Sequence, residues 1–278
     1  ACISNASSPP AGCERSPVRA EDDYNDVDTY GARAALKVDL NDTWSITPSI
    51  MGQRQDANGS FGYDPAVGDL EIHTWYPTLS EDKFIQSALT IEGKIGNWDL
   101  TLTGGHLRRK TNTESDYSDY GYFYDALSGY SAYWRDNADN PVSPNQYIQG
   151  IDRYRKSFGE FRVSSPQDAS LRFIGGLFWQ RQSHNIEQNY IIDNIADSIT
   201  VPGTDSNIWL TKQQRTDRDY AAFGEISFDV TDKLTLTGGA RVYKYDNSLS
   251  GFFGFSRGSW RNTGVARCIT TTGAEFRD

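Results

Sequence analysis

Apolar residues recur at every second position in eight separate segments of this chain, and this alternation limits its possible folds more than any other feature. A β-strand points successive side chains to opposite faces, so such alternation predicts strands with one apolar and one polar face. Helical spacing of apolar residues is almost absent. The sequence therefore predicts an all-β protein of about eight strands, which span roughly residues 30–40, 44–53, 85–95, 98–103, 160–163, 171–182, 222–230 and 234–242.

The composition agrees with an all-β chain and excludes several other classes. Among the 278 residues are 16 Tyr, 13 Phe and 7 Trp but only 1 Met, a balance typical of β-proteins. No run approaches the length of apolar residues that a transmembrane helix needs. A net charge of −10 argues against a nucleic-acid partner, which would require a basic surface. The mean hydropathy of −0.62 does not separate water from membrane, because a barrel exposes only every second strand residue to lipid.

The polar face of the predicted strands carries charges of both signs, as Arg33, Lys37 and Asp39 show in the first segment. Such a face suits a water-filled lumen or another protein surface, since a dry interior would require every charge to be paired. The apolar face must then be the covered one, either in the core of a β-sandwich or in lipid.

The connections favour lipid, because short and long ones alternate strictly. Short turns are predicted at 41–43, 96–97, about 164–170 and 231–233. Long stretches begin at Asp56, Thr111 and Asn185. Short turns on one side and long loops on the other are typical of outer-membrane barrels, whereas long structureless loops are uncommon in soluble domains.

Strand length and aromatic placement point the same way. The predicted strands of about 10 to 13 residues match the roughly 9–11 that cross a bilayer when tilted. Trp44 and Trp98 lie on the apolar face beside short turns, where an interfacial aromatic girdle belongs. We therefore predict an antiparallel up-and-down transmembrane β-barrel segment with short periplasmic turns and long extracellular loops. A soluble β-sandwich is the second interpretation.

The negative charge is concentrated in the long stretches, while strands and short turns together are net positive. Three explanations remain open. The acidic loops keep the protein soluble, bind lipopolysaccharide phosphates through divalent cations, or attract cationic solutes.

No arrangement of residues predicts an enzyme, a metal site or a cofactor. His73, His106 and His184 fall in separate segments without metal-ligand spacing. The string at 254–258 matches Gly-x-Ser-x-Gly, but neither a helical pattern nor a later His follows it. Cys2 and Cys13 lie in one Pro/Ser-rich stretch on the loop side, and export through an oxidising periplasm favours a disulfide between them.

Aromatic residues crowd the long stretch after Thr111 and recur near the C-terminal end. Rigid amphipathic rings supply a large contact area at a low entropy cost, as a ligand-capturing mouth requires. The alternative is that the rings pack the loops against each other and against the headgroup belt. The candidate substrate-binding residues are Tyr117, Tyr120, Tyr122, Tyr124, Trp134, Phe253 and Trp260.

Two hairpins look like copies of one template. In both, a Phe-Gly-Glu triplet (158–160 and 223–225) precedes a strand that carries a double glycine (175–176 and 238–239). The glycines permit local coiling and close approach of whatever lies against the inner wall. With the runs at 220–225, 234–241 and 243–246, this pattern resembles the barrel of TonB-dependent outer-membrane receptors of the iron-complex type, over roughly residues 24 to 256.

The resemblance implies a function as well as a fold. It implies energy-coupled uptake of a bulky scarce nutrient across the bacterial outer membrane, with a ferric siderophore as the first choice. The partners would be outer-membrane lipid and lipopolysaccharide, a plug domain and the TonB energy-coupling complex. Residues 1–278 would then form part of the receptor barrel, without its plug domain and C-terminal strands.

The inward face of that barrel would contact the plug or line the solute path, and its charges include Arg33, Glu92, Arg172 and Arg241. A different class of function remains open: a small closed barrel with an adhesin or structural role, since eight strands suffice to close one. That alternative requires the first strand to pair with the last.

Overall fold

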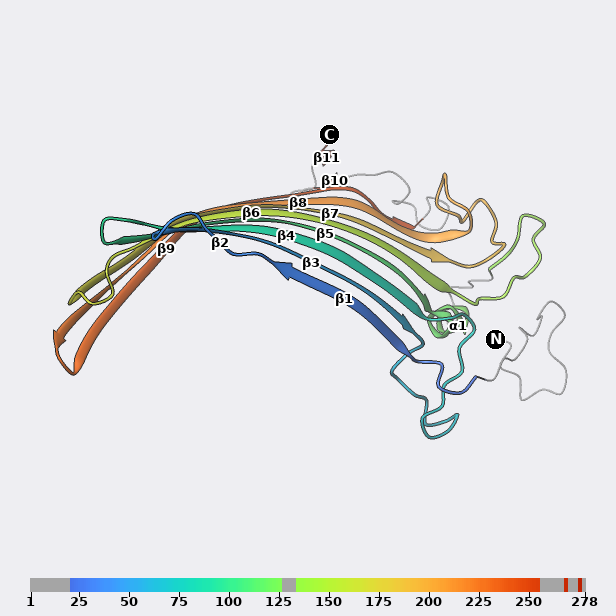
Figure 1. Cartoon of the computed structure of the whole chain (residues 1–278). Helices are drawn as coiled ribbons and strands as arrows, with labels where there is room; N and C mark the ends of the chain where they lie inside the picture. Colours follow the sequence, from blue (N-terminus) through green and yellow to red (C-terminus); the bar gives the residue numbers. More distant parts are fainter. Residues whose placement is uncertain (1–20, 127–133, 256–267, 270–274, 277–278) are drawn as a thin grey trace.

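One antiparallel sheet of nine strands dominates the computed structural model, which describes residues 21–126, 134–255, 268–269 and 275–276. Strand order is β1-β3-β4-β5-β6-β7-β8-β9, with β2 also paired to β3, so the sheet is the predicted up-and-down meander (Figure 1). A separate pair is formed by β10 and β11. The elements are β1 (Val27–Ala35), β2 (Val38–Asp39), β3 (Trp44–Asn58), β4 (Leu79–Ile95), β5 (Trp98–Asp116), α1 (Ser118–Ala126), β6 (Tyr147–Ser164), β7 (Leu171–Ile191), β8 (Asn207–Thr231), β9 (Leu234–Phe255), β10 (Cys268–Ile269) and β11 (Glu275–Phe276).

Short connections gather at one end of the sheet, while α1 and the longer connections lie at the other (Figure 1). We call these the turn end and the loop end. Local chemistry explains the turns: Asn41 Oδ1 accepts hydrogen bonds from the backbone N–H groups of Thr43 (2.9 Å) and Trp44 (3.0 Å). Gly96 adopts φ +60°, a conformation that glycine reaches without strain. The predicted alternation of short and long connections is confirmed.

The strands are longer than the alternation predicted. From β3 to β9 they contain between 15 and 25 residues, so parts of the expected loops, such as 111–116 and 185–191, are strand. The physical reason is that these parts lack an apolar face, since residues 111–116 are polar on both sides of the strand. Apolar alternation stops there, but the backbone ladder of hydrogen bonds continues.

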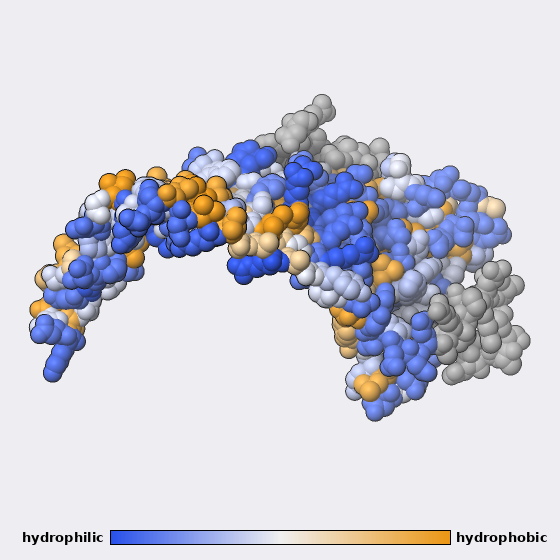
Figure 2. Space-filling model, viewed as in Figure 1, coloured by the Kyte–Doolittle hydropathy of each residue, from blue (hydrophilic) through white to orange (hydrophobic). Residues whose placement is uncertain are grey.

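Side-chain exposure separates the two faces of the sheet. In β4, Ile85 and Leu89 are 49% and 43% exposed, whereas their neighbours Gln86 and Ala88 are half-buried. Side chains crowd on the concave side of a curved sheet and spread on its convex side, so this difference places the apolar face outside. Hydrophobic residues also gather along the upper, convex rim of the arch near the turn end (Figure 2). The outward face is therefore the apolar one.

The edges of the sheet remain open. Within the described ranges β1 pairs only with β3 and β9 only with β8, and most residues of both strands are exposed. The closed small barrel required β1 and β9 to pair, and the open sheet does not support it. The soluble sandwich is wrong, because the described strands from β1 to β9 form a single sheet. Within the described residues, helices that meet the length and hydropathy needed to cross a membrane are absent.

The double glycines have a specific packing role that the sequence did not reveal. Antiparallel register pairs Gly105 with Phe158 and Gly176 with Phe223, and both pairs lie on the inward face. A Cβ at Gly105 would lie 2.7 Å from the Phe158 ring, and one at Gly176 would lie 2.5 Å from the Phe223 ring. Each Phe of the repeated triplet therefore covers a glycine on the preceding strand, an arrangement that holds the register of the wall.

Candidate functional site

The buried residues of this chain lie mainly at the loop end of the sheet. Ile192 is fully buried, and Ile195 and Ile208 are nearly so. Trp134 and Val142, from the connection after α1, pack against them, as do other half-buried residues of the same end: Tyr190, Ile199 and Trp209. Burial of this apolar surface fixes the long connections to the strands, so the loop end is a packed surface.

A chain of aromatic rings crosses the loop end from Tyr117, just before α1, to Phe253 in β9. The ring centroids of Tyr117 and Tyr190 are 5.8 Å apart, those of Tyr190 and Trp209 are 6.4 Å apart, and those of Trp209 and Phe253 are 5.7 Å apart. All three pairs meet edge to face, the geometry that aromatic quadrupoles favour. The register places Tyr190, Trp209 and Phe253 on the inward face. We call these four rings the aromatic mouth.

Tyr117 directly precedes α1, which lies within the long connection that the sequence predicted after Thr111. Asp116 Oδ1 accepts a hydrogen bond from the Ser118 N–H (2.8 Å), which satisfies one free donor at the helix start. The Tyr117 N–H donates to the Gln146 carbonyl (2.8 Å) and so ties the helix to the start of β6. Gly121 is required there, because a Cβ would collide with the Pro144 carbonyl oxygen.

Two tyrosines, Tyr76 from the connection between β3 and β4 and Tyr147 from the first position of β6, share one carboxylate beside this helix. The hydroxyl of Tyr76 donates to Asp193 Oδ2 (3.3 Å) and that of Tyr147 to Asp193 Oδ1 (3.2 Å), while their rings lie 4.5 Å apart. Burial, together with the Asp193 charge, raises the pKa of Tyr147 to about 12 and raises that of Tyr76 as well. Both phenols therefore stay protonated and keep the connections joined at neutral pH.

Below the aromatic mouth, the inward face carries a hydrogen-bonded polar network. His184 Nε2 lies 2.6 Å from Asp152 Oδ1, and its ring stacks on Tyr154 at 3.8 Å between centroids. Asp217, which is only 5% exposed, accepts hydrogen bonds from the Tyr245 hydroxyl (2.6 Å) and from Arg215 Nε (3.1 Å). Paired charges of this kind keep an inward surface polar without leaving a buried charge alone.

The sequence-predicted aromatic residues have different placements. Tyr117 and Phe253 belong to the aromatic mouth, and Tyr120 is 41% exposed beside Tyr117 at 4.8 Å. Tyr122 is buried against Trp75 and donates to Asn145 Oδ1 (2.6 Å), so its ring packs the connections. Trp134 also packs, against the Ile192 cluster. The Tyr124 side chain, Trp260, Cys2 and Cys13 lie outside the part that the structure describes.

Sequence reasoning missed Tyr190 and Trp209, the two central rings of the aromatic mouth. Both lie outside the segments of apolar alternation, in a part of the sequence where strand and loop could not be distinguished. The alternation of β7 could have indicated Tyr190. It occupies an even-numbered position, like Gln180 and Gln182 on the polar face of the same strand.

The four charged residues predicted to face the lumen share the inward face, as the register shows. Arg172 forms a bidentate ion pair with Asp229 (2.5 and 2.7 Å). Arg241 lies over the Phe178 ring at 5.2 Å and near Asp219 at 3.9 Å. Arg33 lies in β1 and Glu92 lies in β4.

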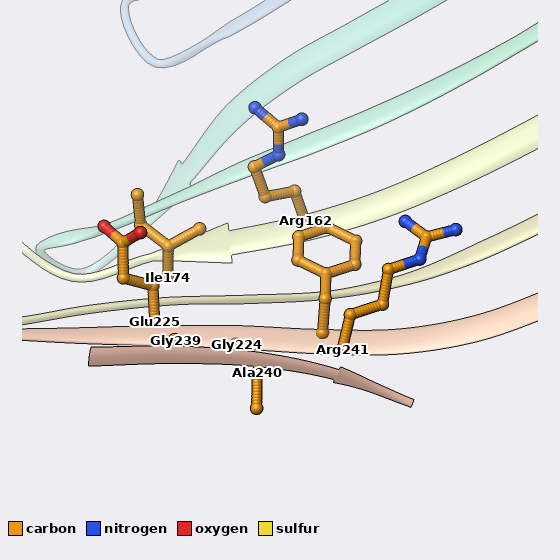
Figure 3. Close-up of a pocket in the computed structure, with 8 residues that line it drawn as sticks. Arg162, Ile174, Gly224, Glu225, Gly239, Ala240 and Arg241 are labelled. Carbon is orange, nitrogen blue, oxygen red and sulfur yellow. The ribbon is translucent and has the colours of Figure 1, made fainter. Parts of the chain in front are cut away.

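A shallow pocket opens on the inward face near the turn end. It is lined by Arg162, Glu225 and Arg241, with Ile174 and Phe223 between them. Figure 3 shows Arg162, Glu225 and Arg241 pointing to one side of the sheet and Ala240 to the other. No group of three or more His, Cys, Asp or Glu side chains that could hold a metal ion occurs among the described residues.

The fold is similar to that of a solved uptake receptor. The crystal structure of the ferric yersiniabactin uptake receptor FyuA from Yersinia pestis matches 80% of this chain with a TM-score of 0.59 and 12% sequence identity. The match covers 34% of that receptor, so this chain spans about a third of its length. No family model and no curated protein matches the sequence. This likeness supports a β-barrel type of fold, which in the described residues is an open curved sheet.

Proposed function

We propose that this chain forms part of the wall of an outer-membrane receptor that takes up a bulky, scarce solute through a plugged barrel. A ferric siderophore is the solute class we favour. The observation that carries this proposal is the sheet itself, apolar on its convex face and polar on its concave face, with aromatic rings at the loop end of the concave face. Apolar residues outside and polar ones inside suit a wall between lipid and water.

The open edges of the sheet support a wall that continues. Unpaired strand edges cannot lie in lipid, because each unsatisfied N–H or C=O group costs free energy there. Further strands that pair with β1 and β9 would remove both edges, and the TonB-dependent receptors that the sequence resembles have larger barrels. In such a barrel the inward charges would face a plug domain, and energy coupling to the TonB complex would act through that plug.

The role we assign to the aromatic mouth is capture, without covalent chemistry. Large planar chelates contact aromatic rings over a wide area, and the rings of Tyr190 and Trp209 are already held in place by the Ile192 cluster. Burial and the neighbouring Tyr117 raise the pKa of Tyr190, so its phenol stays a neutral hydrogen-bond donor. A preorganised neutral surface of this kind binds bulky solutes with little loss of side-chain entropy.

An uptake assay on cells that produce the protein tests this proposal. Replacement of Tyr190 and Trp209 by Leu should lower binding and uptake of a labelled ferric siderophore by about tenfold or more, because central aromatic rings dominate such contacts. The matched control replaces Trp179 and Tyr220 by Leu. These are aromatic neighbours on the same two strands, but they lie on the outward face.

The two variants distinguish capture from folding. Outer-membrane abundance of each variant, measured by immunoblot, should stay near that of the parent. Equal uptake by the mouth variant and the parent across a panel of ferric siderophores would contradict the proposal. An equal loss of uptake in the outward control would assign the effect to wall stability.

A further inference from the structure

Six cationic side chains form a continuous patch on the outward face of the sheet, above its apolar zone. They come from four neighbouring strands, are fully or partly exposed, and are Arg108, Lys110, Arg153, Arg155, Arg181 and Arg218. We call this patch the basic belt. The sequence does not show it as a cluster, because the residues are scattered from β5 to β8 and only the register brings them together.

Like charges lie directly opposite each other within the belt. The register pairs Arg108 with Arg155, and it pairs Lys110 with Arg153. A third such pair joins Arg181 to Arg218. Like charges at directly opposite positions destabilise a sheet, so an anion bound between them would relieve the repulsion in all three pairs.

The chain supplies no such anion for most of the belt. Within the described ranges, none of the six cations lies within 4.0 Å of a carboxylate oxygen in an ion pair; Asp246 lies opposite Arg218 in the register but pairs with Lys244. Arginines on the inward face differ, since Arg109 pairs with Asp82 and Arg215 with Asp217. Other cations on the outward strand faces have carboxylate partners, such as Arg54 with Glu81 and Lys212 with Glu187, so the lack of a partner distinguishes the six residues of the belt from these cations among the described residues.

The position of the belt along the strands indicates which part of a bilayer would surround these charges. Trp179 and Tyr220 are exposed aromatic residues on the outward face, and Arg181 and Arg218 occupy the next outward positions toward the loop end. One such step along a strand is about 6.6 Å. Aromatic girdles lie at the boundary of the hydrocarbon region, so the belt lies at the level of the lipid headgroups.

The belt also runs parallel to the line of the short turns. The register aligns Trp44, the first residue of β3, with Leu100 in β5. Leu171, the first residue of β7, lies farther toward the turn end than the residue of β7 that aligns with Leu100. From Lys110 in β5 to Arg218 in β8 the belt shifts toward the turns in the same way. Both lines thus follow one plane across tilted strands, as expected for the surface of a bilayer.

We propose that the basic belt binds the phosphate groups of a phosphorylated glycolipid in the outer leaflet. Guanidinium groups match phosphate oxygens in a bidentate geometry, and five of the six residues are arginines. The acyl chains of the same lipid would cover the apolar zone below, so one ligand satisfies both surfaces. This inference rests on the proposed membrane placement and adds a lipid class and its binding residues.

The test uses this chain together with the strands that complete its barrel, in nanodiscs of neutral phosphatidylcholine that contain a small fraction of bisphosphorylated lipid A. Association of lipid A with the wall is measured by native mass spectrometry and compared with association of the same lipid after removal of its phosphates. The phosphorylated form should bind at least about tenfold more tightly, and added salt should weaken that preference. Equal binding of the two forms would overturn the inference.

A charge-matched pair of variants assigns the effect to the belt. The triple substitution Arg155→Gln, Arg181→Gln and Arg218→Gln should remove most of the phosphate preference. The control carries Lys37→Gln, Lys94→Gln and Lys233→Gln, which remove the same charge from exposed positions at the turn end. Loss of the preference in the control would indicate a net-charge effect and contradict the belt. Inorganic phosphate that binds as tightly as lipid A would contradict a lipid as the source.

A second readout separates this inference from the proposed function. Quenching of tryptophan fluorescence by lipids with brominated acyl chains reports whether Trp98 and Trp179 lie in the bilayer. Insertion without a phosphate preference would overturn the belt alone. No insertion would overturn both proposals. Equal quenching of the belt variant and the parent would show that the variant retains its fold.

Discussion

Substitution of Gly176 by Ala should destabilise the wall, although alanine usually stabilises a strand relative to glycine. An added Cβ would lie 2.5 Å from the Phe223 ring and 2.6 Å from the Phe161 carbonyl oxygen. The ring can rotate aside, but the carbonyl belongs to the backbone ladder between β6 and β7 and cannot move without breaking it. Overpacking of this kind costs about 1–3 kcal/mol, which exceeds the roughly 0.5–1 kcal/mol that alanine gains over glycine.

The matched control is Gly238→Ala, in the equivalent double glycine of β9. A Cβ there meets no atom within 4 Å, so the substitution should be neutral or slightly stabilising. Urea unfolding of each variant in the same detergent, followed by tryptophan fluorescence, measures the difference in the free energy of unfolding. We expect Gly176→Ala to lower this free energy by about 1–2 kcal/mol relative to the control.

A double variant identifies which contact carries the cost. Gly176→Ala combined with Phe223→Leu removes the ring but keeps the carbonyl, so only part of the lost stability should return. Full recovery would show that the ring alone causes the strain. A Gly176→Ala variant as stable as Gly238→Ala would refute the reasoning, because the register-fixed contact would then have no energetic consequence.

The remaining predictions concern the connections. Burial, together with the Asp193 charge, raises the pKa of Tyr147 to about 12, against about 10 in the unfolded chain. The protonated phenol therefore stabilises the loop end below pH 10, and this stabilisation should disappear as the pH rises from 10 to 12. Phenolate absorbance checks this, and Asp193→Asn should lower the titration midpoint. Asn41→Ala removes the side-chain acceptor of the turn before β3 and should cost about 1 kcal/mol in urea unfolding, whereas a change near zero would contradict that role. Thiol titration of unreduced, denatured protein should find Cys2 and Cys13 unreactive, and three reactive thiols would exclude their disulfide.

The sequence predicted the fold well where burial on one face imposed a period of two. Segments such as 44–53 and 234–242 lie within strands as expected, and turns such as Asn41-Asp42-Thr43 were recognisable from their side chains. Prediction failed above the apolar zone, where water on both faces removes the pattern. The upper halves of the strands and the helix α1 were therefore missed, since neither carries a periodic apolar stripe.

For the candidate site, the sequence indicated aromatic residues but could not indicate which of them meet. Tyr117 and Tyr122 are close in sequence, yet one contributes to the inward mouth and the other packs a connection. The central rings, Tyr190 and Trp209, come from strand ends that the alternation did not reach. Proximity across strands depends on register, and register depends on the whole ladder of hydrogen bonds.

By itself, the sequence determined a sheet with an apolar and a polar face, because side-chain alternation is a local property of every strand. The tertiary structure alone decided which residues are neighbours on those faces. Antiparallel register places Phe223 over Gly176 and brings Arg108 opposite Arg155. A shift of one residue in pairing would move each side chain to the other face, so these contacts exist only once the strands are aligned.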